Sequence, residues 1–187
     1  MMRGELVRPE GLELSLDVID ETLERETAAA IQACSLEPMI IHDNPSRRRV
    51  AHFGVSYTAA TRSTGAAPPI PEVFLYVVRK AARALGAEEV GFEEVLVTDY
   101  PAGAGIGSHR DAPAFGRVIG ISLLSPCTLR FARGSGLSRQ VWEQLLPPRS
   151  AYLLSGAART DWKHGIRAVT RQRMSVTARE LRPSRHM

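Results

Sequence analysis

The chain has 187 residues, of which 44% are hydrophobic and 24% charged, and its formal net charge is +4. This length suits one domain with a single sizeable core, and the composition is that of a globular protein. No apolar run approaches the roughly 20 residues of a membrane-spanning helix, and no secretory leader is visible after Met1. We therefore expect one domain over residues 1–187, monomeric and cytoplasmic, with no membrane contact.

The basic residues are almost all arginine, with Lys80 and Lys163 as the exceptions. A sequence pI near 9.5 suits a polyanionic partner such as nucleic acid, although a preference for arginine can also reflect genomic base composition. The dense basic run is Arg47, Arg48 and Arg49. It is either a surface that contacts phosphates or a solvated turn in front of a strand.

The N-terminal part of the sequence predicts short strands and one helix in front of a loop. The expected elements are strands at 11–19, 39–43 and 50–57 and a helix over 21–34. Asp20 is a typical N-cap for this helix. Between 58 and 71 the residues are mainly Thr, Ala, Ser, Gly and Pro, which are too small or polar to pack. We expect residues 1–49 to form an extension and residues 50–71 to form a mobile lid over the substrate.

The rest of the sequence predicts a second helix followed by many short strands. Pro71 suits the first position of a helix that ends before Gly86. The strands expected after it lie at 92–100, 106–111, 117–125, 128–133, 140–146, 151–155 and 171–179. The apolar run from Val118 to Leu124 is typical of a strand buried on both faces. The pattern indicates an α+β, mainly β domain, with a jelly-roll core over 91–182 and the two helices of the N-terminal half packed on one outer face.

His109 and Asp111 form a candidate metal-binding pair. In an extended chain residues i and i+2 face the same side, so the imidazole and the carboxylate can bind one ion while Arg110 points away. His164 would supply a third ligand, and two histidines with one carboxylate are typical of non-haem Fe(II) oxygenases. A His-x-Asp pair also occurs at the solvated ends of strands, so the metal interpretation depends on support from elsewhere in the chain.

The glycines before this pair do not predict a nucleotide-binding loop. Gly103, Gly105 and Gly107 match neither phosphate-binding fingerprint, and the next element is expected to be a strand and not a helix. They are expected to form a tight turn that lets the backbone approach a ligand closely.

The last strand carries a polar stripe that supports the metal interpretation. Its polar face consists of Arg173, Ser175, Thr177 and Arg179, while the residues between them are apolar. Guanidinium groups bind carboxylates bidentately, and hydroxyls satisfy the remaining acceptors, so this face can hold a small dicarboxylate. The alternative is an ordinary half-exposed strand.

With these motifs the chain resembles the AlkB-like branch of the Fe(II)/2-oxoglutarate-dependent dioxygenases, which have a double-stranded β-helix (jelly-roll) core. The resemblance covers most of the chain from about Val50 onward and is carried by Thr98-Asp99-Tyr100, His109-Arg110-Asp111, His164 and Arg173 to Arg179. It implies that His109, Asp111 and His164 bind Fe(II). It also implies that Tyr100, Arg173 and Ser175 hold the distal carboxylate of 2-oxoglutarate, and that Arg179 faces the carboxylate beside the keto group.

Two positions depart from the family pattern. Thr98 stands where many members carry asparagine, so we expect one hydrogen bond to the cosubstrate to be shortened, lost or carried by water. Ala112 and Pro113 follow Asp111 where some DNA-repairing members have acidic groups that read the damaged base. The resemblance therefore supports the oxygenase chemistry more strongly than the target.

The resemblance implies that oxidation of a substrate C–H bond accompanies conversion of 2-oxoglutarate and O2 to succinate and CO2. An N-methyl group on a nucleobase of DNA or RNA would leave as formaldehyde, and the base would be flipped out of its stack. Tyr57 or Trp162 is a candidate to stack on it, with core packing as the alternative for each, and Arg47, Arg48 and Arg49 are candidate phosphate contacts. Two other functions stay open: oxidation of a protein side chain or small metabolite, and a barrel that binds a metal or small acid without turnover.

Overall fold

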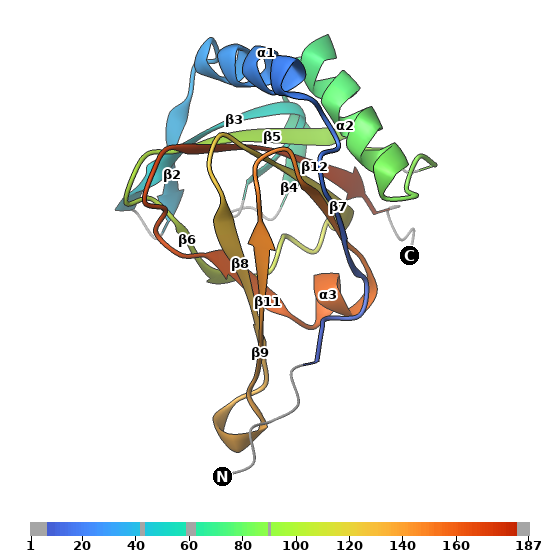
Figure 1. Cartoon of the computed structure of the whole chain (residues 1–187), viewed down its shortest axis with the longest axis vertical. Helices are drawn as coiled ribbons and strands as arrows, with labels where there is room; N and C mark the ends of the chain where they lie inside the picture. The colour runs from blue at the N-terminus through green and yellow to red at the C-terminus, as the bar shows by residue number, and fades with distance from the viewer. Residues whose placement is uncertain (1–6, 42–43, 59–62, 90, 183–187) are drawn as a thin grey trace.

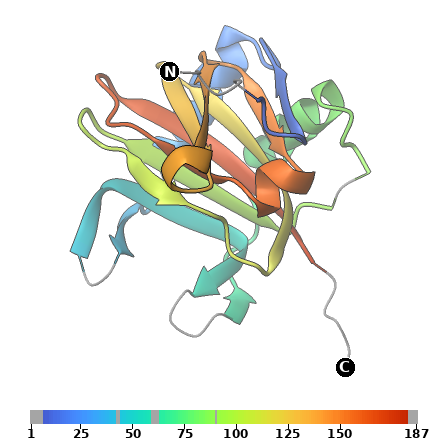
Figure 2. The same cartoon turned by 90° about the horizontal axis from the view of Figure 1, so that it is seen from below.

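Two antiparallel β-sheets face each other, and two helices cover the outer side of the larger sheet (Figure 1). This is a computed structural model, and it describes residues 7–41, 44–58, 63–89 and 91–182. Figure 2 shows the same layers from below, with the smaller sheet toward the viewer. The expected double-stranded β-helix, with both helices on one face, is confirmed. None of the described helices is long and apolar enough to span a membrane.

The major sheet has eight strands in the order β1-β10-β7-β12-β5-β3-β2, with β4 paired to β3. Their bounds are β1 Leu12–Ser15, β2 Glu37–Ile41, β3 Asn44–Thr58, β4 Ser63–Ala66, β5 Glu94–Tyr100, β7 Phe115–Leu123, β10 Ala151–Leu154 and β12 Arg173–Leu181. The minor sheet has the order β6-β11-β8-β9. Its strands are β6 Ile106–His109, β8 Cys127–Arg133, β9 Gln140–Leu146 and β11 Lys163–Ile166.

The major sheet separates two apolar cores because its side chains alternate between its faces. On the outer face, α1 (Glu21–Gln32) and α2 (Glu72–Ala84) pack against β5, β7 and β12. This core includes Phe74, Val97 and Val176, all fully buried. The second core lies between the two sheets and contains Phe131 and Trp162. As predicted, the run in β7 is buried on both faces, since Val118 belongs to one core and its neighbour Ile119 to the other.

α1 begins where the sequence predicts, and α2 begins one residue later than predicted. The Asp20 side chain accepts a hydrogen bond of 2.8 Å from the Leu23 backbone N–H, and this satisfies one of the free donors of the first turn of α1. Pro71 precedes the first residue of α2. A third, short helix, α3 (Gly156–Thr160), follows β10, and a 3-10 turn, η1 (Gly136–Ser138), lies between β8 and β9.

The stretch expected to be a loop is ordered over part of its length. Residues 63–66 form β4, which pairs with the end of β3, while residues 59–62 lie outside the described part of the chain. The prediction was wrong for β4 because all four of its side chains are exposed, so the strand is held by backbone pairing and leaves no apolar pattern in the sequence.

Candidate active site

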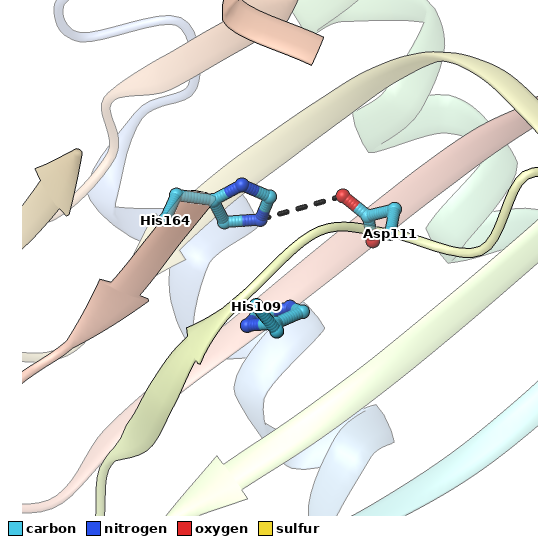
Figure 3. Close-up of side chains that lie close together, drawn as sticks. All are labelled: His109, Asp111 and His164. Atoms are coloured by element: carbon cyan, nitrogen blue, oxygen red, sulfur yellow. Dashed lines mark ion pairs between the residues drawn. The ribbon is translucent and has the colours of Figure 1, made fainter. Parts of the chain in front are cut away.

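Three side chains, two from the neighbouring strands β6 and β11 and one from the segment after β6, converge between the sheets (Figure 3). His109 ends β6, and Asp111 follows two residues later. His164 lies on β11 directly opposite His109 in the antiparallel pairing, so both imidazoles leave the same face of the minor sheet. One ligand atom from each residue lies within 4.8 Å of the other two. The structure thus brings the three predicted metal ligands together.

The protonation states of these groups suit a divalent metal. Burial, together with the nearby His164, lowers the pKa of His109 to about 4, so this ring is neutral at pH 7. Its Nδ1 lies 2.9 Å from the Gly107 carbonyl oxygen, which leaves Nε2 free as a ligand. Burial raises the pKa of Asp111, but Arg179 and the two histidines together hold it well below its ordinary value. The carboxylate is therefore ionised.

Buried polar atoms in this cluster lack partners that a metal would supply. The Oδ2 atom of Asp111 has no hydrogen bond within the described chain and lies 3.3 Å from Nε2 of His164. A buried carboxylate oxygen left without a donor or a cation is costly. Two imidazoles and one carboxylate on one side of an open position are the donor set of a non-haem iron site. The residues present therefore fit Fe(II).

A chain of ion pairs fixes Arg179 beside this cluster. Its Nε donates to Asp111 Oδ1 at 2.9 Å, and its Nη1 donates to Glu94 Oε2 at 2.7 Å. The other oxygen of Glu94 lies 3.0 Å from Nδ1 of His52. Glu94 is almost fully buried; burial raises its pKa, but Arg179 and His52 hold the pKa below its ordinary value. The sequence analysis did not find Glu94, because a glutamate at the start of a strand gives no local signal of burial.

Arg173 is a buried cation with no carboxylate partner among the described residues. Its side chain is 1% exposed, its Nε donates to Ser122 Oγ at 3.2 Å, and its guanidinium stacks on the Tyr100 ring at 4.9 Å. Its Nη1 has no hydrogen-bond partner in the described chain. Tyr100 and Thr98 on β5 lie opposite Arg173 and Ser175 on β12, so four of the five predicted cosubstrate residues form one cluster. A buried guanidinium without a counter-ion is costly, so this position favours binding of an anionic ligand.

The metal cluster lies where two cavities meet. The inner cavity has a volume of about 40 Å³, and its walls include Thr98, Tyr100 and Tyr152. The outer cavity, which we call the cleft, has a volume of about 1090 Å³. His109 and Asp111 line both cavities. The sequence analysis did not select Tyr152, because its strand, β10, has an apolar sequence that is typical of an ordinary core strand.

The two aromatic candidates for substrate stacking lie in different places. Tyr57 lines the cleft, where its ring meets Phe115 edge-on at 5.9 Å. Trp162 is 1% exposed, belongs to the core between the sheets and is covered by the Arg133 guanidinium at 4.6 Å. Trp162 does not line the cleft, so core packing, the alternative weighed for it, describes its position.

The arginine run is not one basic surface, because it lies in β3 and its side chains alternate between the two faces. Arg47 and Arg49 are exposed, whereas Arg48 is buried and lines both cavities. Arg49 is neutralised by the buried Asp99 at 2.6 Å. Burial lowers the pKa of Arg48, and a hydrogen bond with Tyr100 offsets part of this effect. The predicted phosphate contact is therefore wrong for Arg48 and unsupported for Arg49.

Comparisons with known proteins agree with this geometry. The family model of the 2OG-Fe(II) oxygenase superfamily matches residues 18–185. The "Alkylated DNA repair protein ALKBH8 homolog" of Arabidopsis thaliana is 29% identical over 180 residues, which cover 83% of this chain and 50% of that protein. The mouse "tRNA (carboxymethyluridine(34)-5-O)-methyltransferase ALKBH8" is 30% identical over 125 residues, which cover 64% of this chain and 18% of that protein. The chain thus spans half or less of the length of these relatives.

Two solved structures share the fold. OsALKBH1 superposes with a TM-score of 0.72 at 17% identity, over 94% of this chain and 99% of that one. A prolyl-4-hydroxylase from Pseudomonas putida superposes with a TM-score of 0.63 at 14% identity, over 92% of this chain and 93% of that one. At these identities the likeness concerns the fold alone.

Proposed function

Since the chain belongs to the 2OG-Fe(II) oxygenase superfamily, we propose that this AlkB-like dioxygenase oxidatively demethylates N-alkylated nucleobases in DNA or RNA. Its cofactors are those of the superfamily: Fe(II), 2-oxoglutarate and O2. When bound, they oxidise a C–H bond while 2-oxoglutarate and O2 become succinate and CO2. When the oxidised carbon is an N-methyl group, the products from the substrate are formaldehyde and a base with a free N–H.

The residues of the chain position these groups. His109, Asp111 and His164 would hold the metal, and Arg173 would pair with the distal carboxylate of 2-oxoglutarate, the anion that this buried guanidinium lacks among the described residues. Glu94 fixes the Arg179 guanidinium next to Asp111, where it would face the carboxylate beside the keto group. Thr98 and Tyr100, which lie opposite Ser175 and Arg173, line the inner cavity beside the metal cluster.

The observation that carries the proposal is the position of the metal ligands at the junction of the inner cavity and the cleft. A cleft of about 1090 Å³ is large enough for a flipped base, and Tyr57 and Phe115 give it an aromatic wall. The β3–β4 hairpin that carries Tyr57 is the proposed lid. The names of the two curated relatives, alkylated DNA repair and tRNA modification, support a nucleic-acid substrate.

The test is turnover on matched panels of methylated DNA, RNA, peptides and small metabolites. We expect formaldehyde and succinate in equal amounts from a methylated oligonucleotide. Succinate that rises with a peptide or metabolite, and with no oligonucleotide, would instead establish the alternative substrate class. A protein that makes no succinate from 2-oxoglutarate and iron under any condition would be a binding module and not an oxygenase.

A further inference from the structure

A hollow of about 420 Å³ lies outside the cleft, at the hairpin that joins β8 and β9. This hairpin carries η1 and stands out from the body of the molecule (Figure 1). The side chains that give the hollow its charge are Arg110, Arg133, Arg139 and Lys163, and no carboxylate of the described residues lines it. Within the part of the chain that the structure describes, none of these four cations forms an ion pair.

The hollow is held in shape by neutral contacts that leave its charge uncompensated. Arg133 donates from Nε to the Gln140 side-chain oxygen at 2.5 Å and stacks on Trp162. Arg110 donates to the Asp161 carbonyl oxygen at 2.8 Å. In the turn, Gly134 has a φ of +71°, and a Cβ there would lie 2.7 Å from the Ser138 carbonyl oxygen, so the tight turn requires glycine.

The hollow adjoins the metal centre through the edge of the minor sheet. Ser108 and Lys163 line it, and each is the sequence neighbour of a metal-ligating histidine. Because side chains alternate along a strand, these two residues point to the face opposite the metal. Arg110 lines both the hollow and the cleft. A polymer with one group in the cleft would therefore cross edge strand β6 and reach the hollow.

We propose that this hollow binds backbone phosphates of the substrate nucleic acid next to the modified nucleotide. The inference rests on the proposed nucleic-acid substrate and replaces Arg48 and Arg49 of β3 as its electrostatic basis, while Arg47 stays an exposed candidate. Phosphodiesters are the anions that unpaired arginines and lysines bind along a chain, and each such contact releases counterions. Arg133 and Arg110 are already fixed by their neutral partners, so ordering them costs little on binding.

The test compares two double variants that remove the same charge. Arg139→Gln with Lys163→Gln removes two cations of the hollow, whereas Lys80→Gln with Arg83→Gln removes two from α2, on the outer side of the major sheet. A labelled methylated single-stranded oligonucleotide is titrated between 50 and 200 mM salt. We expect the slope of log affinity against log salt to fall by about 1.4 for the hollow variant, since each phosphate contact on a single strand contributes about 0.7. The α2 variant should keep the slope of the unaltered protein.

Other readouts separate this inference from the proposed function. Succinate formation without oligonucleotide should be equal in all three proteins, which shows that the metal centre is intact. Equal salt slopes in the two double variants would show that the hollow does not bind phosphates. The proposed demethylation activity would not be affected by that result. If oligonucleotide binding depends on the hollow but no formaldehyde is released, the hollow binds phosphates and the proposed demethylation is wrong. Polyglutamate that binds as tightly and with the same dependence on the hollow would refute the assignment to phosphates.

Discussion

Replacing Arg173 by methionine tests whether the buried guanidinium serves the cosubstrate or the fold. Among the described residues this cation has a hydroxyl, the Cys127 thiol and an aromatic ring as partners but no carboxylate. Methionine fills a similar volume without the charge, so the free energy of unfolding of the cosubstrate-free protein should change by less than about 1 kcal/mol or rise. Loss of a bidentate contact should weaken 2-oxoglutarate binding by about 2–4 kcal/mol, or roughly 30- to 1000-fold.

Thermal unfolding with and without 2-oxoglutarate measures both effects, with Mn(II) in place of Fe(II) to avoid oxidation. At 100 times its dissociation constant, 2-oxoglutarate should stabilise the unaltered protein by about 2.7 kcal/mol, which raises its Tm by roughly 5–11 °C. At the same concentration the Arg173→Met protein should shift by less than about 3 °C. Arg173→Lys keeps the charge but not the planar fork and should fall between the two. The exposed Arg171→Met is the matched control. An undiminished shift in Arg173→Met would refute the role of this residue.

Three further predictions concern the metal ligands and the sheet. Asp111→Ala should abolish succinate formation with an unchanged circular dichroism spectrum, because it removes a metal ligand and no apolar contact; activity above background would exclude it as a ligand. The metal-free protein should lose stability on acidification, because the pKa of His109 falls from 6.5 to about 4 on folding, so the unfolded chain binds more protons between these values. Urea unfolding should show that the free energy of unfolding is lower at pH 4.5 than at pH 7, by up to roughly 3 kcal/mol from His109. This contribution should be absent in His109→Asn. Gly120→Ala should destabilise the protein by about 1–3 kcal/mol, because its Cβ would lie within 2.4 Å of the buried Tyr152 ring, whereas Gly107→Ala, which meets no atom within 4 Å, should be tolerated.

The sequence by itself determined the features that depend on local backbone geometry. Strict alternation in the last strand placed Arg173 and Arg179 on one face, and β12 has them there. The i, i+2 spacing brought His109 and Asp111 to one side of the chain in the same way. Asp20 and Pro71 marked the helix starts because capping involves only the first turn.

Only the tertiary structure decided the features that depend on which strands become neighbours. β11 was not predicted, since Lys163–Ile166 shows neither alternation nor an apolar run in the sequence, and its pairing with β6 is what sets His164 opposite His109. Which arginines stay exposed and unpaired is also decided by the neighbouring strands. Three consecutive arginines look alike in the sequence, but pairing of β3 with β5 buries Arg48 and gives Arg49 the carboxylate of Asp99. Side-chain alternation can be read from one strand, whereas the partner that neutralises a charge comes from another strand, here fifty residues away.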